Sequence, residues 1–559
     1  MPTFTIDDRE ISCPDGWTVL QAAHASGIEI PHYCYHPGLS IAGNCRICLV
    51  EIEKFPKPAI ACNTVATEGM VVHTRSDKVR EWREAVMEFL LINHPLDCPI
   101  CDQAGECKLQ EFSYRYGMPT TRFREEKEHG PKARRLGPHV VFDWERCIKC
   151  TRCIRFCEEV TGTGELAMFL RGVREEIGVF PGRPLDNPYS GNVVDLCPVG
   201  ALTLKEFRFR SRVWFLQNVP SVCPGCARGC SIDIGEFRNQ VYRITPRENH
   251  AVNRWWICDT GRLWGERLRE AAGRRLSGPR TVSDPGPDPW RAALADAARI
   301  LGEATRSGRV AVLASPRASV EETWLLARLA RGVLGDAPVH LAQHEQGEDD
   351  DLLIRRDRAP NARGARAVLE AICGTPRPVA DLQRALEDGG IDVLFAVGPG
   401  LVGPVDDEPA LLSPDALARA RDVIVLDAWA SPLSDAATVL LPAAAWGETS
   451  GTYVNFAGRV QWAERAMIPA ADCRPLVMLL GDLLAHLSLE PAPPSPEAIT
   501  ERVVADVPEF AGIRWQDLLA SEGQNLAGVR AEEQACRATG ALVRMLEAER
   551  RVSPASAGE

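Results

Sequence analysis

The spacing of the cysteines constrains this chain more than any other feature of its sequence. Of its 20 cysteines, 16 lie between Cys34 and Cys258, many of them separated by only two or three residues. So many cysteines in a secreted chain would suggest disulfides, whereas tight spacings in a cytosolic chain favour metal ligation. The strand-like start after Met1, without a leader of the secretory kind, leads us to expect a cytoplasmic, bacterial-type protein. Thiolates are soft ligands, so zinc and iron–sulfur clusters are the candidates.

The first ligand set has the composition that a 2Fe–2S cluster requires. Two irons and two sulfides need four thiolates, and plant-type ferredoxins supply them in a similar way with a shorter first gap. The four cysteines are separated here by ten, two and thirteen residues: Cys34, Cys45, Cys48 and Cys62. The alternative is a zinc ribbon, which usually pairs two Cys-x2-Cys knuckles, and this stretch contains only one. We therefore predict a 2Fe–2S cluster here.

The second ligand set combines one imidazole with three thiolates. A lone histidine is usually a core or surface residue, but three cysteines follow this one within thirteen positions. The set is His94, Cys98, Cys101 and Cys107. The histidine follows an expected helix that Pro95 ends and whose apolar stripe is Val79, Trp82, Val86 and Leu90. A neutral imidazole in place of a thiolate makes such a site less negative, so we expect a distinct reduction potential.

The third ligand set lies in a ferredoxin-like run in which one cysteine is left over. In two-cluster ferredoxins the fourth cysteine of such a run serves a second cluster, whose other ligands precede a Cys-Pro pair at three-residue steps. Those positions are occupied here by Val194, Gly191 and Pro188. One 4Fe–4S cluster is therefore predicted, and Cys157 is expected to be a packed thiol. The predicted ligands are Cys147, Cys150, Cys153 and Cys197.

The stretch from His94 to Cys107, with the four cysteines before it, closely resembles the large iron–sulfur subunit of respiratory complex I, NADH:quinone oxidoreductase. That resemblance implies a 2Fe–2S cluster, a histidine-ligated 4Fe–4S cluster, and a single 4Fe–4S cluster in the region of Cys147. A further set resembles the N-terminal 4Fe–4S module of molybdopterin oxidoreductases, and a cluster that only some bacterial complex I subunits keep. It consists of Cys223, Cys226, Cys230 and Cys258. We expect one 2Fe–2S and three 4Fe–4S clusters.

Beyond the Pro- and Gly-rich stretch Ser277–Pro289 the chain changes character. Strand-like runs alternate with helical stretches, which predicts a parallel α/β sheet. The runs are Val310–Leu313, Val393–Val397, Val423–Leu426 and Val439–Leu441. The stretch from Asp435 to Gln461 resembles the molybdopterin oxidoreductase core, although the part between the first two strands is far shorter than in active molybdenum enzymes.

The cysteines of this last region have no recognisable metal-ligand context. They are Cys373, Cys473 and Cys536. Gly398 and Gly400 end a strand and could hold a phosphate, but a glycine-rich strand end alone is weak support for that. We therefore expect a degenerate, cofactor-free scaffold and no molybdopterin.

These observations predict a multidomain protein of the α+β and α/β classes. The expected domains are a β-grasp 2Fe–2S ferredoxin-type domain (1–78), a small helical His/Cys-ligated 4Fe–4S domain (79–118), a ferredoxin-like 4Fe–4S domain (138–213), a molybdopterin-oxidoreductase-type 4Fe–4S domain (214–273) and a degenerate molybdopterin-oxidoreductase-like parallel α/β domain (290–559). The charged segment 119–135 is expected to be a solvated linker, with a partner contact as the alternative.

The resemblance implies an electron-transfer subunit of NADH:quinone oxidoreductase with no catalytic residue of its own. Electrons would enter from the flavin of an NADH-binding partner subunit, pass the 2Fe–2S and histidine-ligated clusters, and leave through the Cys147 cluster towards quinone. The expected partners are that subunit and other peripheral-arm subunits, with the membrane arm reached only indirectly, at the cytoplasmic face of the plasma membrane. A net charge of −12 gives no support to nucleic-acid binding, and no apolar run reaches the length of a membrane span.

Two other classes of function are weighed against this one. The first is an electron-transfer or diaphorase subunit of an NAD-linked hydrogenase or formate dehydrogenase. A molybdoenzyme needs a metal-binding cysteine beyond residue 280 in a larger domain, and a diaphorase subunit typically ends before a molybdopterin-like domain. The second is a zinc-stapled structural protein, which the His94 set and the 27-residue gap before Cys258 disfavour.

Overall fold

The computed structural model describes residues 1–172, 174–307, 309–398, 400–401, 410–520 and 523–529. The chain divides into two compact units, Met1–Leu216 and Gln217–Cys536, which are described separately below. Cys536 and the end of the predicted last domain, from residue 530 on, lie outside the described residues. Within the described residues no helix combines the length and the apolar character that crossing a membrane requires.

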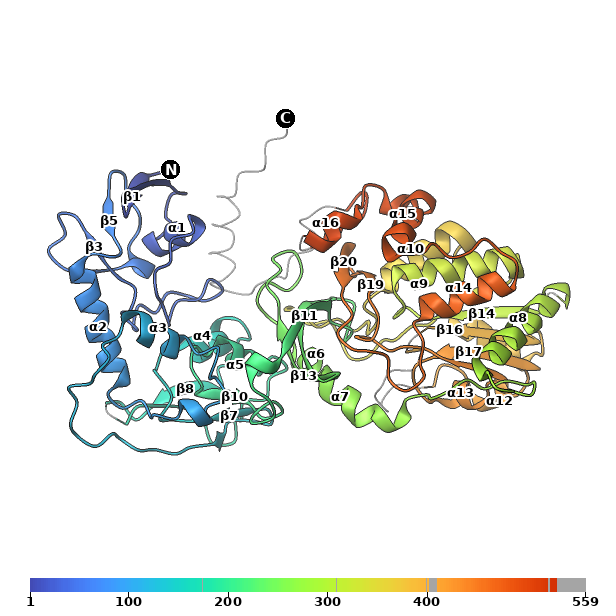
Figure 1. The fold of residues 1–559 in the computed structure, drawn as a ribbon, viewed down its shortest axis with the longest axis horizontal. Coiled ribbons are helices and arrows are strands. Elements are labelled where there is room, and N and C mark those ends of the chain that lie inside the picture. Colours follow the sequence, from blue (N-terminus) through green and yellow to red (C-terminus); the bar gives the residue numbers. More distant parts are fainter. Residues whose placement is uncertain (173, 308, 399, 402–409, 521–522, 530–559) are drawn as a thin grey trace. The chain divides into compact units, whose positions relative to one another are not determined.

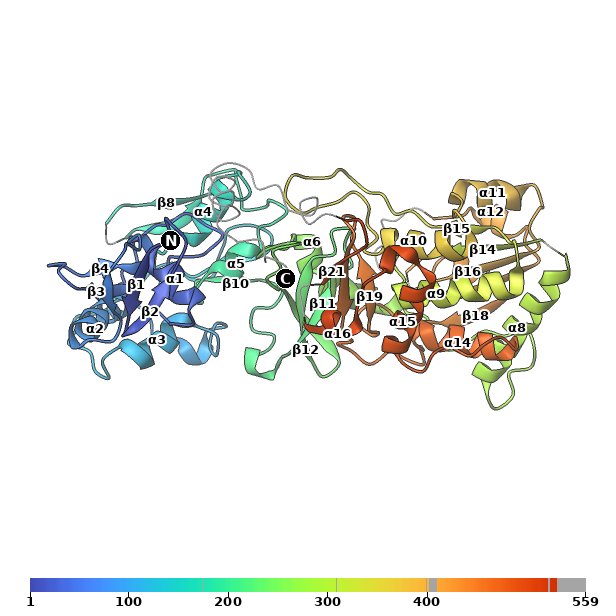
Figure 2. The same ribbon diagram turned by 90° about the horizontal axis from the view of Figure 1, so that it is seen from above.

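The first unit opens with a mixed five-stranded sheet of strand order β2-β1-β5-β3-β4, visible in blue at the N-terminal end of the chain (Figure 2). The strands are β1 (Thr3–Ile6), β2 (Arg9–Ser12), β3 (Leu49–Ile52), β4 (Ala59–Ile60) and β5 (Val71–His73). The helix α1 (Val19–Ala25) begins where Thr18 and Gln21 form a capping box. Its buried residues, Val19 and Leu20 among them, share one core with Phe4, Ile6 and Val72 of the sheet. This core carries the loop that holds the first ligand set.

The remainder of the first unit is built from short elements that connect the second and third ligand sets. Its helices are α2 (Asp77–Leu91), α3 (Lys108–Tyr116), α4 (Arg152–Glu159) and α5 (Asn192–Leu196). Its strands form the sheet β10-β7-β6 and the pair β8-β9: β6 (Arg134–Arg135), β7 (Val140–Phe142), β8 (Leu166–Phe169), β9 (Glu176–Val179) and β10 (Leu202–Leu204). These strands span only two to four residues, so loops carry most of the structure between the predicted ligands.

The helix α2 confirms the predicted helix, but a different face of it is buried. The fully buried side chains are Val79, Arg83 and Met87, whereas Trp82, Val86 and Leu90 of the predicted stripe are only half-buried. Tertiary contacts cause this difference, because Arg83 points into the protein and donates to the Leu49 carbonyl at 3.1 Å. The hydroxyl of Tyr33 reaches the Met87 sulfur at 3.3 Å.

The second unit begins with an antiparallel sheet that carries the fourth ligand set. Its strands are β11 (Gln217–Val222), β12 (Ser231–Phe237) and β13 (Gln240–Pro246), and the short helices α6 (Asp259–Arg262) and α7 (Trp264–Glu270) follow. The hairpin β11–β12 pairs Val222 with Ser231, so the intervening loop of cysteines is held at both ends.

The main sheet of the second unit is parallel, as predicted, with strand order β15-β14-β16-β17-β18. The four expected runs are β14 (Val310–Ala314), β16 (Val393–Val397), β17 (Asp422–Asp427) and β18 (Val439–Pro442), while the edge strand β15 (Val339–Leu341) was not predicted. Alternate residues face two cores: Val310 and Val312 face one, and Ala311 and Leu313 face the other. Helices cover both faces, as a parallel sheet requires (Figure 1).

The helices of this layer arrangement, and the elements that follow it, complete the second unit. They are α8 (Pro289–Ser307), α9 (Val320–Leu329), α10 (Ala362–Cys373), α11 (Val379–Glu387), α12 (Pro414–Leu417), α13 (Pro432–Asp435), α14 (Leu476–His486), α15 (Pro496–Asp506) and α16 (Trp515–Ala520), with the strands β19 (Gly451–Val454), β20 (Arg459–Ala463) and β21 (Gln524–Asn525). Together the two units confirm the predicted α+β and α/β fold class.

Candidate metal centres

The fold brings the four cysteines of the first set into contact. Their side chains form a hydrogen-bonded group: the Cys34 sulfur is hydrogen-bonded to the thiols of Cys45 and Cys62, and the Cys48 sulfur is hydrogen-bonded to the Cys62 thiol. Hydrogen bonds from the Cys45 and Cys62 thiols, together with the backbone N–H groups of Cys45 and Asn44, lower the pKa of Cys34 to about 2 despite its burial. Gly43 takes a left-handed backbone (φ 62°) in the turn just before Asn44. The loop thus favours negative charge at the Cys34 sulfur, while the pKa values of Cys45 and Cys62, whose thiols donate to it, are raised.

The second set lines one cavity, which extends to Gln110, Arg146 and Gly200. His94, Cys98, Cys101 and Cys107 all contribute to its wall. Burial lowers the pKa of His94 to about 4, and the neighbouring cations Lys127 and Arg146 act in the same direction. The imidazole is therefore neutral at pH 7, which is the form that binds a metal. Unlike the other three members of the set, Cys98 is exposed.

A glycine lets the backbone approach the second set closely. A Cβ placed on Gly200 would lie 2.2 Å from the Cys101 sulfur and 3.1 Å from the Cβ of Gln103. No side chain fits at this position without displacing Cys101. Gly200 lies three residues after Cys197 of the third set, so the two sets meet here.

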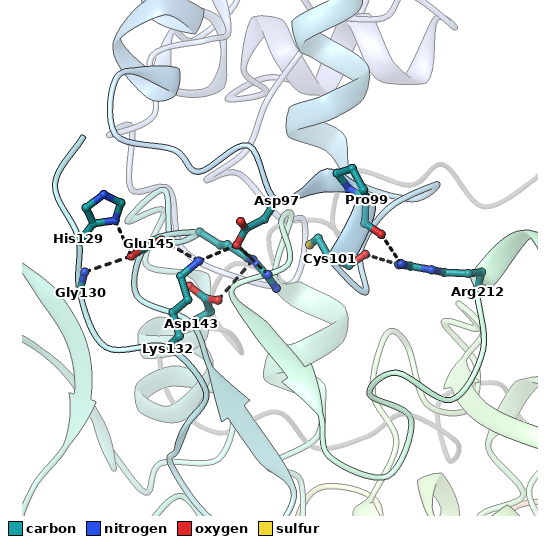
Figure 3. Close-up of polar contacts among 10 residues, drawn as sticks. Asp97, Pro99, Cys101, His129, Gly130, Lys132, Asp143, Glu145 and Arg212 are labelled. Carbon is teal, nitrogen blue, oxygen red and sulfur yellow. Dashed lines mark hydrogen bonds and ion pairs between the residues drawn. The ribbon is translucent and has the colours of Figure 1, made fainter. Parts of the chain in front are cut away.

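An ion-pair network surrounds the loop of the second set (Figure 3). Asp97, which precedes Cys98, accepts from Lys132 at 2.7 Å and from Arg146 at 2.9 Å. Lys132 also pairs with Glu145 at 2.8 Å. Arg146 pairs in addition with Asp143 at 3.4 Å. Of the cations at this set, Lys132 and Arg146 are thus paired with carboxylates of the protein.

The segment 119–135 is mostly exposed, as expected from its charge, but side chains such as Lys127 and Lys132 attach it to this site. Lys127 donates to the carbonyls of Leu91 and Ile92, at 2.8 and 2.6 Å, and so caps the C-terminal end of α2 just before His94. On the other side of the loop, Arg212 donates to the Cys101 carbonyl at 2.6 Å, and it also bonds the Pro99 carbonyl (Figure 3). Sequence reasoning missed these contacts because none of them follows a local pattern.

The third set is gathered between the loop before α4 and the end of α5. Cys150 and Cys153 are buried, and the thiols of Cys147, Cys150 and Cys197 all act electrostatically on Cys153. Backbone N–H groups point at the sulfurs: Lys149 donates to Cys147 at 3.4 Å, and Val199, Ala201 and Leu202 donate to Cys197. Such N–H···S bonds are one way in which a protein tunes the potential of an iron–sulfur cluster.

Cys157 lies on α4 next to this set but is directed elsewhere. Its side chain is fully buried, and it is hydrogen-bonded to Glu165 and to the Leu166 backbone N–H. Burial, together with the Glu165 charge, raises its pKa. These partners of Cys157, Glu165 and Leu166, lie outside the third set, which fits the expectation of a packed residue.

The fourth set is held by the β11–β12 hairpin and the start of α6. Cys223 donates its N–H to the Cys230 carbonyl at 2.8 Å, and the Cys258 sulfur accepts from the Gly261 N–H at 3.4 Å. Burial raises the pKa of Cys258 to about 12, and the Cys226 thiol adds to this. A Cβ on Gly261 would lie 2.7 Å from the Cys223 sulfur. This set is therefore as closely enclosed as the third.

The donor sets fit iron–sulfur clusters. Each has four thiol or imidazole donors, with backbone N–H groups directed at sulfur. In two of the sets a glycine also allows the backbone to approach a ligand sulfur closely. Among the described residues no group of three or more His, Cys, Asp or Glu side chains is arranged to hold a single metal ion.

The carboxyl end of the parallel sheet does not fit a phosphate-bearing pterin. The Gly400 N–H donates to the Asp427 carboxylate at 2.7 Å, and the Gly400 carbonyl accepts from Arg317 at 3.1 Å. A buried carboxylate at this strand end repels phosphate, and it already occupies the N–H that a phosphate would use. Aromatic side chains, Trp429 and Tyr453 among them, line the adjoining cavity. The thiols of Cys373 and Cys473 donate to the carbonyls of Ala327 and Leu276.

Family models match the chain in five consecutive stretches. They are a 2Fe-2S iron-sulfur cluster binding domain (residues 1–77), an NADH-ubiquinone oxidoreductase-G iron-sulfur binding region (83–122), an NADH-quinone oxidoreductase subunit 3 ferredoxin-like domain (137–203), a molybdopterin oxidoreductase Fe4S4 domain (216–269) and molybdopterin oxidoreductase (359–485). The chain thus carries 2Fe–2S and 4Fe–4S binding domains followed by a molybdopterin-oxidoreductase-type domain.

Curated relatives match about half to two thirds of the chain. The G-type subunit of NADH-quinone oxidoreductase from Rickettsia bellii is 47% identical over 263 residues, which cover 47% of this chain and 38% of the relative. The mitochondrial NADH dehydrogenase [ubiquinone] iron-sulfur protein 1 of Solanum tuberosum is 45% identical, with 53% of this chain and 40% of the relative covered. The G-type subunit from Mycobacterium tuberculosis is 40% identical over 371 residues, with coverage of 64% and 45%.

The chain therefore spans less than half the length of these relatives. A solved structure of an NAD+-reducing [NiFe]-hydrogenase in the H2-reduced state is 30% identical, covering 38% of this chain and 91% of the other, with a TM-score of 0.34. Relatives at 40–47% identity and matching domains in the same order agree with one another. Over roughly half of its length, this chain is similar to the G-type subunits of NADH-quinone oxidoreductase.

Proposed function

We propose that this chain is an electron-transfer subunit of an NADH:quinone oxidoreductase, carrying one 2Fe–2S and three 4Fe–4S clusters. The observation that carries the proposal is that each predicted ligand set converges in the fold, with N–H groups directed at its sulfurs. The clusters would supply one-electron carriers, while the chain positions them and tunes their potentials. The names of the relatives favour this function over a subunit of a hydrogenase or formate dehydrogenase.

The proposed ligands and domain limits are those expected from the sequence. The 2Fe–2S ligands are Cys34, Cys45, Cys48 and Cys62. The 4Fe–4S ligands are His94, Cys98, Cys101 and Cys107; Cys147, Cys150, Cys153 and Cys197; and Cys223, Cys226, Cys230 and Cys258. We propose no molybdopterin, because the Asp427–Gly400 contact and the aromatic lining disfavour its phosphate.

The contacts between the ligand sets favour an order different from the one expected above. The third set lies beside the first, since Asn44 donates to the Lys149 carbonyl at 3.1 Å. It also lies beside the second, since Gly200 meets Cys101, and Lys108 donates to the Pro198 carbonyl at 3.2 Å. These contacts support the order first, third, second, with the His94 set nearest the acceptor. The expected exit through the Cys147 set is therefore revised.

We infer the partners from the names of the relatives. The proposed donor is a flavin-bearing, NADH-binding subunit, and the proposed neighbours are the other peripheral-arm subunits of complex I. The chain would reach the membrane arm only through them, at the cytoplasmic face of the plasma membrane. No nucleic acid is among the proposed partners, in keeping with the net charge of −12.

Metal analysis of the anaerobically purified chain tests this function. Cluster stoichiometry predicts about 14 irons per chain, with matching sulfide and with zinc and molybdenum near zero. Low-temperature EPR of the reduced chain should then show signals of both cluster types. Zinc in place of iron would overturn the electron-transfer function, and one molybdenum per chain would assign catalysis to the second unit.

A further inference from the structure

Two buried arginines of α4 have no carboxylate partner within the described residues. Arg152 and Arg155 are 5% and 7% exposed. Arg155 donates to the carbonyls of Cys34 at 2.6 Å, Cys150 at 3.3 Å and Ser40. It also bonds the hydroxyl of Thr151 at 3.3 Å. All these acceptors are neutral, so neither guanidinium forms an ion pair with a carboxylate among the described residues, and the nearby Glu159 carboxylate instead accepts from the Ser40 N–H at 2.8 Å.

The two guanidinium groups lie between the first and third ligand sets. Arg155 bridges them directly, because its acceptors include the carbonyl of one ligand from each set, Cys34 and Cys150. Arg152 donates to the carbonyls of Leu196 at 3.1 Å and Tyr35, which are the neighbours of Cys197 and Cys34.

Burying two neighbouring cations without an anion is strongly unfavourable. Buried charges in proteins are paired or coordinate metals, and the loss of one partner leaves a large desolvation cost. The anions that this fold can offer here are the thiolates of the two ligand sets. A cluster held by four thiolates becomes more negative with every electron it takes up. Fixed cations beside it stabilise the reduced form and raise the potential.

We propose that Arg152 and Arg155 are the shared counter-charges of the two clusters held by the first and third sets. They stabilise the reduced form of both clusters. Because the same two cations act on both, the reduction potentials of the two clusters rise together. This role rests on the proposed function, since it requires both sites to be loaded. The helix α4 is suited to this role, because the same turn supplies Arg152, the ligand Cys153 and Arg155.

The test is an EPR redox titration of the full chain, purified anaerobically with its clusters. Arg155→Gln removes the charge and keeps a hydrogen-bond donor, and Arg155→Lys keeps the charge. We expect Arg155→Gln to weaken reduction of both the Cys34-set and the Cys147-set clusters about tenfold, a shift of about 59 mV to lower potential for a one-electron couple. Arg155→Lys should recover most of the shift, and the His94-set cluster should not move.

Two further variants keep the outcome decisive. Arg152→Gln should lower the same two potentials, and it decides the matter if Arg155→Gln loses its clusters. Arg80→Gln is the control, because Arg80 is exposed, pairs with Asp77 at 3.1 Å and is expected to leave all potentials unchanged.

Retained clusters with unchanged potentials in both Gln variants would overturn the inference. So would a shift in Arg155→Lys as large as that in Arg155→Gln, or an equal shift of the His94-set cluster, since either indicates altered packing and not lost charge. Loss of clusters from both Arg155 variants, with unshifted potentials in Arg152→Gln, would overturn it as well. A wild-type chain without iron would instead overturn the proposed function.

Discussion

The second and third ligand sets share one unit of the chain but differ in how charge is arranged around them. Beside the His94 set, Arg146 and Lys132 are paired with carboxylates, chiefly Asp97. Beside the Cys147 set, Arg152 and Arg155 donate only to neutral groups among the described residues. The ligand types differ as well: one set includes a neutral imidazole and is therefore less negative, and the other has four thiolates. We infer that the potential of each cluster follows from ligand type and uncompensated charge together, not from the number of nearby cations.

The largest effect is expected from a substitution that adds a single methyl group and should disrupt the second ligand set while leaving the third intact. In Gly200→Ala the new Cβ would lie 2.2 Å from the Cys101 sulfur, so the ligand or the backbone must move. We expect loss of the His94-set EPR signal while the Cys147-set signal remains, with about 1–3 kcal/mol lost from the free energy of unfolding. Gly273→Ala is the matched control, because no atom lies within 4 Å of its Cβ. A normal signal in Gly200→Ala would contradict the close approach.

The next largest effect is expected from a substitution that gives both sets the same ligand type. His94→Cys keeps four donors, so the cluster should remain, but a thiolate adds negative charge and should lower the midpoint potential. The shift should exceed that of any single surface-charge change, and an EPR redox titration measures it. An unchanged midpoint would remove His94 from the ligand set.

A smaller effect is expected from removing charge compensation at the second set. Asp97→Asn leaves Arg146 and Lys132 paired only with Asp143 and Glu145, so more positive charge faces the His94-set cluster. Its midpoint potential should rise, by less than His94→Cys lowers it, while the Cys147-set potential should stay constant. Titration of both signals in one sample provides the internal control. A fall in the His94-set potential would show that Asp97 acts through loop position and not through charge.

The smallest effect concerns the cysteine that the third set leaves over. Cys157→Ala removes a buried neutral thiol, so we expect a cost on the order of 1 kcal/mol in stability and no change in the EPR spectrum. Thermal unfolding and EPR of the same preparation check both statements. Loss of the Cys147-set signal would identify Cys157, not Cys197, as the fourth ligand.

The ligand sets were predictable because metal ligation leaves a local trace in the sequence. Spacings such as Cys147-x2-Cys150-x2-Cys153 constrain a loop of a few residues, whatever the remainder of the chain does. The strands of the parallel sheet were predictable for the same reason, since Val393–Val397 is a continuous apolar run. The edge strand Val339–Leu341 was missed, because three residues are too few to show a pattern.

What the sequence could not determine are the relations between distant residues. Which face of α2 is buried depends on Arg83, whose hydrogen-bond partner Leu49 is 34 residues away in the chain. The order of the ligand sets turned on contacts such as Asn44 with Lys149, 105 residues apart. Whether Lys132 in the charged segment is solvated or paired with Asp97 likewise depends on which surface the segment meets.

By itself, then, the sequence predicted the number and type of the ligand sets and determined the α/β class of the second unit, since local spacing and periodicity encode both. Only the tertiary structure decided which sets adjoin one another, which face of α2 is buried, and which cations of the described residues lack a carboxylate. The physical reason is that electrostatic compensation and close approach depend on distances between side chains that chain order does not specify. Arg146 and Arg155 look alike in the sequence, and only their neighbours make one neutralised and the other a free charge beside two ligand sets.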